Sequence, residues 1–125
     1  MKFLLLLLIS MSIYASDISW ITSYKEAIQK AQSEDKHILV FMSKEGCKSC
    51  QFMNEKVFVD EAVSNYINKN YIALHLDIHD NDAPKSLQVS VTPVFHFLTS
   101  KGEKFKETLY GGKTAPFFIK TIHID

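Results

Sequence analysis

Arginine is absent from this sequence of 125 residues, and all 14 of its basic residues are lysines. Without the planar guanidinium fork, bidentate recognition of phosphate or carboxylate groups is disfavoured. Acidic residues also number 14, so the formal net charge is zero and no basic surplus points to nucleic acid. These absences argue against a nucleic-acid partner and carry little further functional weight.

The longest apolar run lies at the start of the chain, where residues 3–9 follow Lys2 without a polar interruption. A transmembrane anchor needs about 20 apolar residues, and serines followed by Asp17 end this segment too soon. Ile13 and Ala15 suit the −3 and −1 positions of a signal peptidase site.

The pattern predicts a signal peptide over residues 1–15 that is cut after Ala15. An uncleaved membrane anchor is the alternative. Residues 16–125 then form the exported domain, and we expect the bacterial periplasm as its compartment. Export would place both cysteines of the chain where disulfides persist.

The remaining sequence alternates between helical and extended patterns. Apolar residues recur every three or four positions over 20–35, and a continuous apolar run over 37–42 is typical of a strand covered on both faces. Later patterns predict a helix from 47 and a second helical start at Asp60-Glu61, either a continuation or a new short helix, which residues 68–70 close. They also predict a strand over 71–78, a short helix over 84–88, an antiparallel hairpin of strands 94–98 and 104–110, and a helix capped by Thr114. The order predicts one α/β domain with a central mixed sheet flanked by helices.

The two cysteines, Cys47 and Cys50, are separated by Lys48 and Ser49. A disulfide across so short a loop adds little stability, because the entropic gain grows with loop length. At a helix N-terminus, however, free N–H groups and the helix dipole favour a thiolate at Cys47, and Lys48 adds a positive charge. Since Cys50 lies one turn later, the spacing predicts Cys47 as the nucleophile and Cys50 as the resolving thiol.

Three other interpretations of the polar side chains stay open. In the first, Cys47 and Cys50 form a passive local disulfide. In the second, they are half of a zinc site that would need two more ligands. His75, Asp77 and His79 would share one strand face and suggest a metal, although polar residues at a strand end are commoner. We predict no metal site, and we expect His96 to be structural rather than a general base.

The strand over 38–42 that leads into Cys47 and Cys50 is followed later by Val91-Thr92-Pro93-Val94-Phe95 and by Gly111-Gly112. In these features the chain resembles the thioredoxin superfamily, specifically its exported members, over about residues 20–122. The resemblance implies a thioredoxin fold with a mixed sheet of four to five strands. It also implies a cis Thr92–Pro93 bond beside the sulfurs, with Thr92 and Pro93 contacting substrate.

Two departures from the family pattern concern the cysteine pair. Phe41 stands where thioredoxins have a buried aspartate six residues before the first cysteine, and Gly46 replaces a tryptophan. Lys44 and Glu45 are nearby, but we expect both to be solvated loop charges. Lys48 and Ser49 replace the Gly-Pro dipeptide of reducing thioredoxins, so we predict that they modulate the potential. A cation beside Cys47 favours the reduced form and a more oxidising couple.

The function predicted is that of a thiol:disulfide oxidoreductase acting on protein thiols and disulfides, with reduction or isomerisation favoured over oxidation. It requires no cofactor, and we expect a monomer. An exported reductant would need a membrane-bound thiol donor for recycling. The alternatives are a non-enzymatic adaptor or metal chaperone that uses the two thiols as ligands, and a partner-binding domain in which the thiols form a redox switch.

Overall fold

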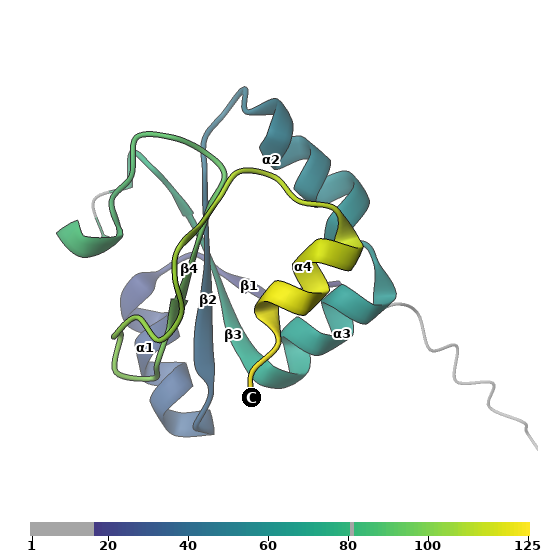
Figure 1. Ribbon diagram of the computed structural model, residues 1–125. Helices are drawn as coiled ribbons and strands as arrows, with labels where there is room; N and C mark the ends of the chain where they lie inside the picture. The colour runs from purple at the N-terminus through teal and green to yellow at the C-terminus, as the bar shows by residue number, and fades with distance from the viewer. Residues whose placement is uncertain (1–16, 81) are drawn as a thin grey trace, which may run out of the picture.

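The computed structural model describes residues 17–80 and 82–125. The predicted signal peptide lies outside these residues. Within them, five strands form one sheet in the order β1-β3-β2-β4-β5. The strands β1, β2 and β3 are parallel to one another, whereas β4 runs antiparallel to β2 and β5 antiparallel to β4. Four α-helices flank this mixed sheet (Figure 1), so the predicted thioredoxin fold is confirmed.

The sheet is built around the apolar run that the sequence placed at its centre. The bounds of the strands are Trp20–Ile21 for β1, His37–Ser43 for β2, Tyr71–Asp77 for β3, Val94–Leu98 for β4 and Leu109–Tyr110 for β5. In β2 only the first residue, His37, is not buried. A strand with neighbours on both edges and helices on both faces has no polar surface, which explains its unbroken apolar run.

Helices cover both faces of the sheet. One face carries α1, and the other carries α2, α3 and α4 (Figure 1). The bounds are Tyr24–Glu34 for α1, Lys48–Phe52 for α2, Glu61–Asn70 for α3 and Ala115–Ile122 for α4. A π-helical turn, η1, spans Met53–Val57 and extends α2, and a 3₁₀ turn, η2, spans Lys85–Leu87.

Side-chain caps fix the starts of two helices. The Ser23 hydroxyl accepts the N–H of Glu26 at the start of α1, and the Asp60 carboxylate accepts the N–H of Val63 at the start of α3. Such caps satisfy N–H groups that have no partner within the helix. Because Ser23 caps it, α1 begins at Tyr24 rather than at the predicted residue 20.

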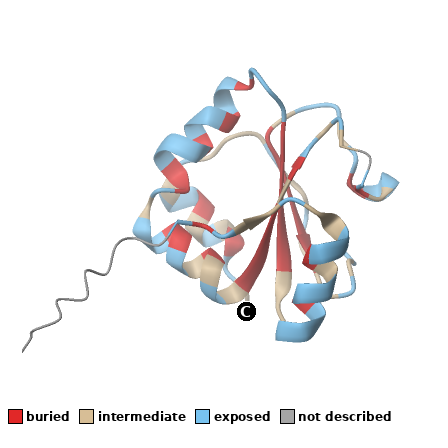
Figure 2. Ribbon diagram, turned by 180° about the vertical axis from the view of Figure 1, so that it is seen from behind, coloured by how far each residue is buried: buried red, intermediate tan, exposed pale blue. Residues whose placement is uncertain are grey.

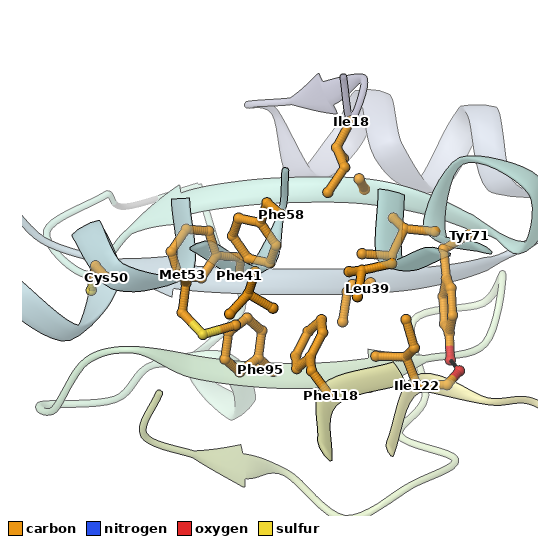
Figure 3. Packing of buried hydrophobic residues seen from close by; sticks show 14 of the residues in the cluster. Ile18, Leu39, Phe41, Cys50, Met53, Phe58, Tyr71, Phe95, Phe118 and Ile122 are labelled. Atoms are coloured by element: carbon orange, nitrogen blue, oxygen red, sulfur yellow. Dashed lines mark hydrogen bonds between the residues drawn. The ribbon is translucent and has the colours of Figure 1, made fainter. Parts of the chain in front are cut away.

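The buried residues form two clusters, one on each face of the sheet, while the outer sides of the helices are exposed (Figure 2). The cluster under α2, α3 and α4 is a row of large side chains (Figure 3). Cys50 lies at one end of this row and Tyr71 at the other, with Met53, Phe41 and Leu39 between them. The cysteine pair is therefore attached to the core rather than to a free loop.

Two predicted elements differ from the observed ones. The predicted strand over 104–110 is reduced to β5 and one isolated bridge between Leu98 and Lys104. Between them, the side chain of Lys106 donates hydrogen bonds to the carbonyls of Thr121, in the last turn of α4, and of His123, which follows it. At the other end, the residues of β1 pair with β3 instead of opening the first helix.

Candidate active site

Cys47 lies between the central strand and the next helix, as predicted. Ser43 ends β2, and the loop 44–46 leads to Cys47, which is the N-cap residue of α2. Gly46 has a φ of 77°, a left-handed conformation that glycine adopts without a steric penalty. Lys44 and Glu45 are exposed, so the expectation that they are solvated loop charges is confirmed.

The two cysteines form a disulfide whose Cα atoms lie 5.2 Å apart. The backbone N–H of Cys50 donates a hydrogen bond to Cys47 Sγ at 3.1 Å. A donor held at this position favours a thiolate over a thiol once the bond is reduced. Cys47 is 8% exposed and Cys50 4%. The arrangement thus suits a pair in which the first sulfur attacks and the second closes the disulfide.

The glycine loop 111–113 packs against the first turns of this helical segment. A Cβ added at Gly112 would lie 3.5 Å from both Cβ and the carbonyl oxygen of Ser49, and the N–H of Lys113 donates to Met53 Sδ at 3.4 Å. The side chains of Lys48 and Ser49 are exposed on the first turn of α2. Their influence on the potential stays a prediction.

The segment that contains Thr92 and Pro93 lies at the same end of the sheet. The Thr92–Pro93 bond is cis, and the Pro93 carbonyl accepts the N–H of Gly111 at 2.9 Å. Because Val94 pairs with Met42, Pro93 continues β4 toward the loop that carries Cys47. The Thr92 hydroxyl is buried and has no hydrogen-bond partner among the described residues. Substrate contact by these two residues stays a prediction.

Three of the exposed large apolar side chains lie in segments near the cysteine pair: Phe52 on the helix of Cys50, and Val91 and Tyr110 beside the cis bond and Gly111. Phe52 is 40% exposed although it belongs to the helix that carries Cys50. Spacings of three and seven residues place Cys50, Met53 and Val57 on the core face, and position 52 falls outside it.

Two surface hollows lie at opposite ends of the molecule. One of about 450 Å³ is lined by residues 88–91 and Tyr110, beside the cis bond. The other, of about 310 Å³, lies near Asp17, Asn68 and Tyr71, at the start of β3 and away from the disulfide. Neither Cys47 nor Cys50 lines either hollow, and the first hollow is bordered by the segment that leads into the cis bond.

Phe41 fills the space under the site where thioredoxins carry an acid. Its ring stacks on Phe95 with centroids 5.3 Å apart and meets Phe58 edge-on at 5.1 Å. On its other side it stacks on the imidazole of His75, with centroids 4.8 Å apart and an interplanar angle of 15°. The aromatic packing leaves no acidic group at this position.

His75 also makes a polar contact that no sequence motif indicated. Its Nε2 lies 2.5 Å from the Ser43 hydroxyl, across neighbouring strands. Burial lowers the pKa of His75, and the nearby carboxylate of Asp77 partly offsets this effect. The register that pairs Phe41 with His75 would have revealed the contact, but register is a property of the folded sheet.

Over residues 17–80 and 82–125, no group of three or more His, Cys, Asp or Glu side chains is arranged to hold a metal ion. Asp77, the last residue of β3, and His79, which follows the strand, are exposed, while the His75 ring is stacked on Phe41.

His96 is held in place by two hydrogen bonds. Its Nε2 lies 2.8 Å from the Leu87 carbonyl, to which it donates, and its Nδ1 lies 3.0 Å from the Thr108 hydroxyl. Burial lowers its pKa, so the neutral ring is favoured. The prediction that His96 is structural is in keeping with these contacts.

Comparisons with known proteins agree with this geometry. The model of the thioredoxin-like family matches residues 19–100. The chain is 27% identical over 105 residues to the thiol:disulfide interchange protein DsbD of Campylobacter jejuni, covering 80% of this chain and 18% of that protein. It therefore spans about a fifth of the length of this relative.

Solved structures give the same fold. A putative disulphide-isomerase from Bacteroides thetaiotaomicron has a TM-score of 0.71 and 28% identity, over 84% of this chain and 88% of that one. The DsbH oxidoreductase has a TM-score of 0.68 and 19% identity, over 87% and 85%. With its disulfide-bonded CxxC pair at a helix start, the chain belongs to the thioredoxin-like family and is homologous to disulfide oxidoreductases.

Proposed function

We propose that this protein is an extracytoplasmic thiol:disulfide oxidoreductase that reduces or isomerises disulfides of protein substrates. The observation that carries the proposal is the Cys47–Cys50 disulfide at the start of α2, with the Cys50 N–H directed at Cys47 Sγ. The similarity to a protein named for thiol:disulfide interchange supports the same chemistry.

The reaction assigns a separate role to each sulfur. The Cys47 thiolate attacks a substrate disulfide, forms a mixed disulfide and releases one substrate thiolate, which takes up a proton. Cys50 then loses its proton and attacks Cys47 Sγ, so the second substrate sulfur leaves as a thiol. The substrate gains two electrons, and the Cys47–Cys50 bond re-forms. Thr92 and Pro93 would line the path of the substrate segment.

The compartment and the recycling partner belong to the proposal. Residues 1–15 have the pattern of a signal peptide, which would release a domain from residue 16 onward, most simply into the bacterial periplasm. No described helix is long and apolar enough to span a bilayer. A reductase in that compartment would need electrons from a membrane-bound thiol donor. We further propose that the domain acts as a monomer and needs no cofactor.

The test combines turnover with capture of partners. We expect the wild-type protein to accelerate the reduction of insulin by dithiothreitol and the Cys50→Ser variant to accumulate mixed disulfides with exported proteins. A Cys47 pKa near the ordinary value of about 8.5, together with no insulin reduction, would overturn the enzymatic proposal. Stoichiometric tight binding of copper or zinc would instead favour the metal-chaperone alternative.

The compartment has an independent test. N-terminal sequencing of the protein isolated from its host should begin at Ser16, and it should be found in the periplasmic fraction. An intact Met1 with membrane association would favour the uncleaved anchor.

A further inference from the structure

We propose that His75 is a positioning residue for the cysteine pair, and that its charge and the redox state of the Cys47–Cys50 bond are coupled. The inference rests on the proposed disulfide chemistry of that pair. It assigns His75 no contact with substrate or sulfur. Its influence passes through Ser43 and Phe41, the two side chains of β2 that touch the imidazole.

The first connection runs along the backbone. His75 Nε2 lies 2.5 Å from the hydroxyl of Ser43, the last residue of β2. The next residue, Lys44, accepts the N–H of Cys47 through its carbonyl at 3.4 Å. The Ser43 carbonyl is itself held by the N–H of Ile78 at 2.9 Å. The contact therefore fixes the strand end from which the active-site loop departs.

The second connection runs through the packed rings. The His75 ring is stacked on Phe41, which belongs to the same buried cluster as Cys47 and Cys50. Trp20 of β1 also lies against the imidazole, and the centroids of the Trp20 and His75 rings are 5.9 Å apart. An interior of this kind screens charge far less than water does, so a charge on the imidazole acts on the sulfurs at longer range.

Among the described residues, the side chains found against the imidazole are uncharged except one. Strand β2 contributes Phe41 and Ser43, and β1 contributes Trp20. The charged group is the exposed carboxylate of Asp77 on the same strand as His75. Burial disfavours the imidazolium, and Asp77 offsets only part of that effect. Near neutral pH the ring is therefore neutral and poised to take up a proton when a new negative charge appears nearby.

Reduction of the disulfide supplies that charge. Two electrons break the S–S bond, one proton is taken up by Cys50, and Cys47 is left as a thiolate. The thiolate stabilises the imidazolium of His75, and the imidazolium stabilises the thiolate by the same free energy. The coupling predicts that reduction raises the pKa of His75, and that acidic conditions favour the dithiol form more strongly than they would without His75.

The decisive measurement uses the wild-type protein. The pKa of each histidine is followed by NMR in the disulfide form and in the dithiol form. We expect reduction to raise the pKa of His75 by about half a unit or more, equivalent to about a threefold change in its proton affinity. His96 on the opposite face of the sheet is the internal control and should not change. Equal pKa values of His75 in both forms would overturn the inference.

A variant provides a second readout. The ratio of dithiol to disulfide at equilibrium with glutathione is measured between pH 5.5 and 8 for the wild type and for His75→Gln. We expect the dithiol-to-disulfide ratio of the wild type to change about threefold more across this pH range than the ratio of His75→Gln does. His96→Gln is the matched control and should keep the wild-type dependence. If His75→Gln does not fold, Ser43→Ala serves instead, and it should alter the pKa of His75 in both forms.

The outcomes separate this inference from the proposed function. Loss of insulin reduction with a preserved change at His75 would reject the enzymatic role and leave the coupling intact. Normal insulin reduction with identical pH dependence in wild type and His75→Gln would reject the coupling alone.

Discussion

The two faces of the sheet are both buried, but they are built from different side chains. The face under α2, α3 and α4 is packed with aromatic rings that contact one another, and its centre consists of Phe41, Phe58, Phe95 and Phe118. The face under α1 is packed with isoleucine, valine, leucine, methionine and alanine. We call these the aromatic face and the aliphatic face.

The two faces have different roles: one supports the cysteine pair, and the other packs α1 against the sheet. The cysteine pair belongs to the aromatic face, where large rings with few rotatable bonds give it a rigid support. On the aliphatic face, Ala27 and Ala31 are fully buried, so α1 lies close against the sheet. The half-buried His75 lies on the aromatic face, and the buried His96 lies on the aliphatic face. Their contacts give the first a link to the redox pair and the second a purely structural role.

The largest effect should come from the chemistry that only the aromatic face carries. We expect Cys47→Ser to lower the rate of insulin reduction by at least about a thousandfold, because it removes the attacking thiolate. The measurement is turnover with dithiothreitol as reductant, and Ser49→Ala is the matched control on the same turn. Substantial activity in Cys47→Ser would reassign the nucleophile.

Neighbouring residues of β4 allow a direct comparison of the two faces. Phe95 and Val94 are both fully buried, the first on the aromatic and the second on the aliphatic face. We expect Phe95→Ala to cost about 3–5 kcal/mol and Val94→Ala about 2 kcal/mol of unfolding free energy. Urea denaturation of the disulfide form measures both. Equal losses would show that ring packing adds nothing beyond ordinary burial.

Acid should weaken the fold through the buried histidines. The pKa values of His75 and His96 are lowered in the folded state, so below the ordinary value of 6.5 the unfolded chain binds more protons. Stability is therefore full above pH 6.5 and declines as the pH falls below it. We expect His96→Gln to cost about 1–3 kcal/mol at pH 7.5 and to reduce the decline toward pH 5. A wild-type stability that is flat from pH 7.5 to 5 would contradict this.

The smallest effect should come from the C-terminal contact on the aromatic face. Lys106 Nζ donates to the carbonyl of Thr121 at 2.8 Å, donates also to that of His123, and lies 5.9 Å from the centroid of the Phe97 ring. We expect Lys106→Met to cost about 1 kcal/mol, since the methionine keeps the aliphatic stem. Thermal unfolding is the measurement. An unchanged melting temperature would mean that water replaces the ammonium group without loss.

Much of the fold followed from local patterns. The apolar run of β2 and the helix starts at Asp60 and Cys47 each depend on residues a few positions apart, and the structure confirms all three. The second hairpin strand was wrong over most of its length, because strand pairing is a tertiary property that the pattern within one segment does not report. The strand pairing of Trp20 was missed for the same reason, since its partner in β3 is Ala73.

The reactive pair followed from local sequence, because a CxxC spacing after a buried strand and before a helix predicts a redox-active pair. The thioredoxin fold was implied by the resemblance that this pair shares with the Thr92-Pro93 and Gly111-Gly112 segments. The surroundings of the pair depend on the folded sheet. Ser43 and His75 are 32 residues apart, and the register of two parallel strands brings them to 2.5 Å. Register depends on the packing of the whole sheet, so no motif reports it. Phe41 leaves the site without an acid, and the fold places a histidine against its ring.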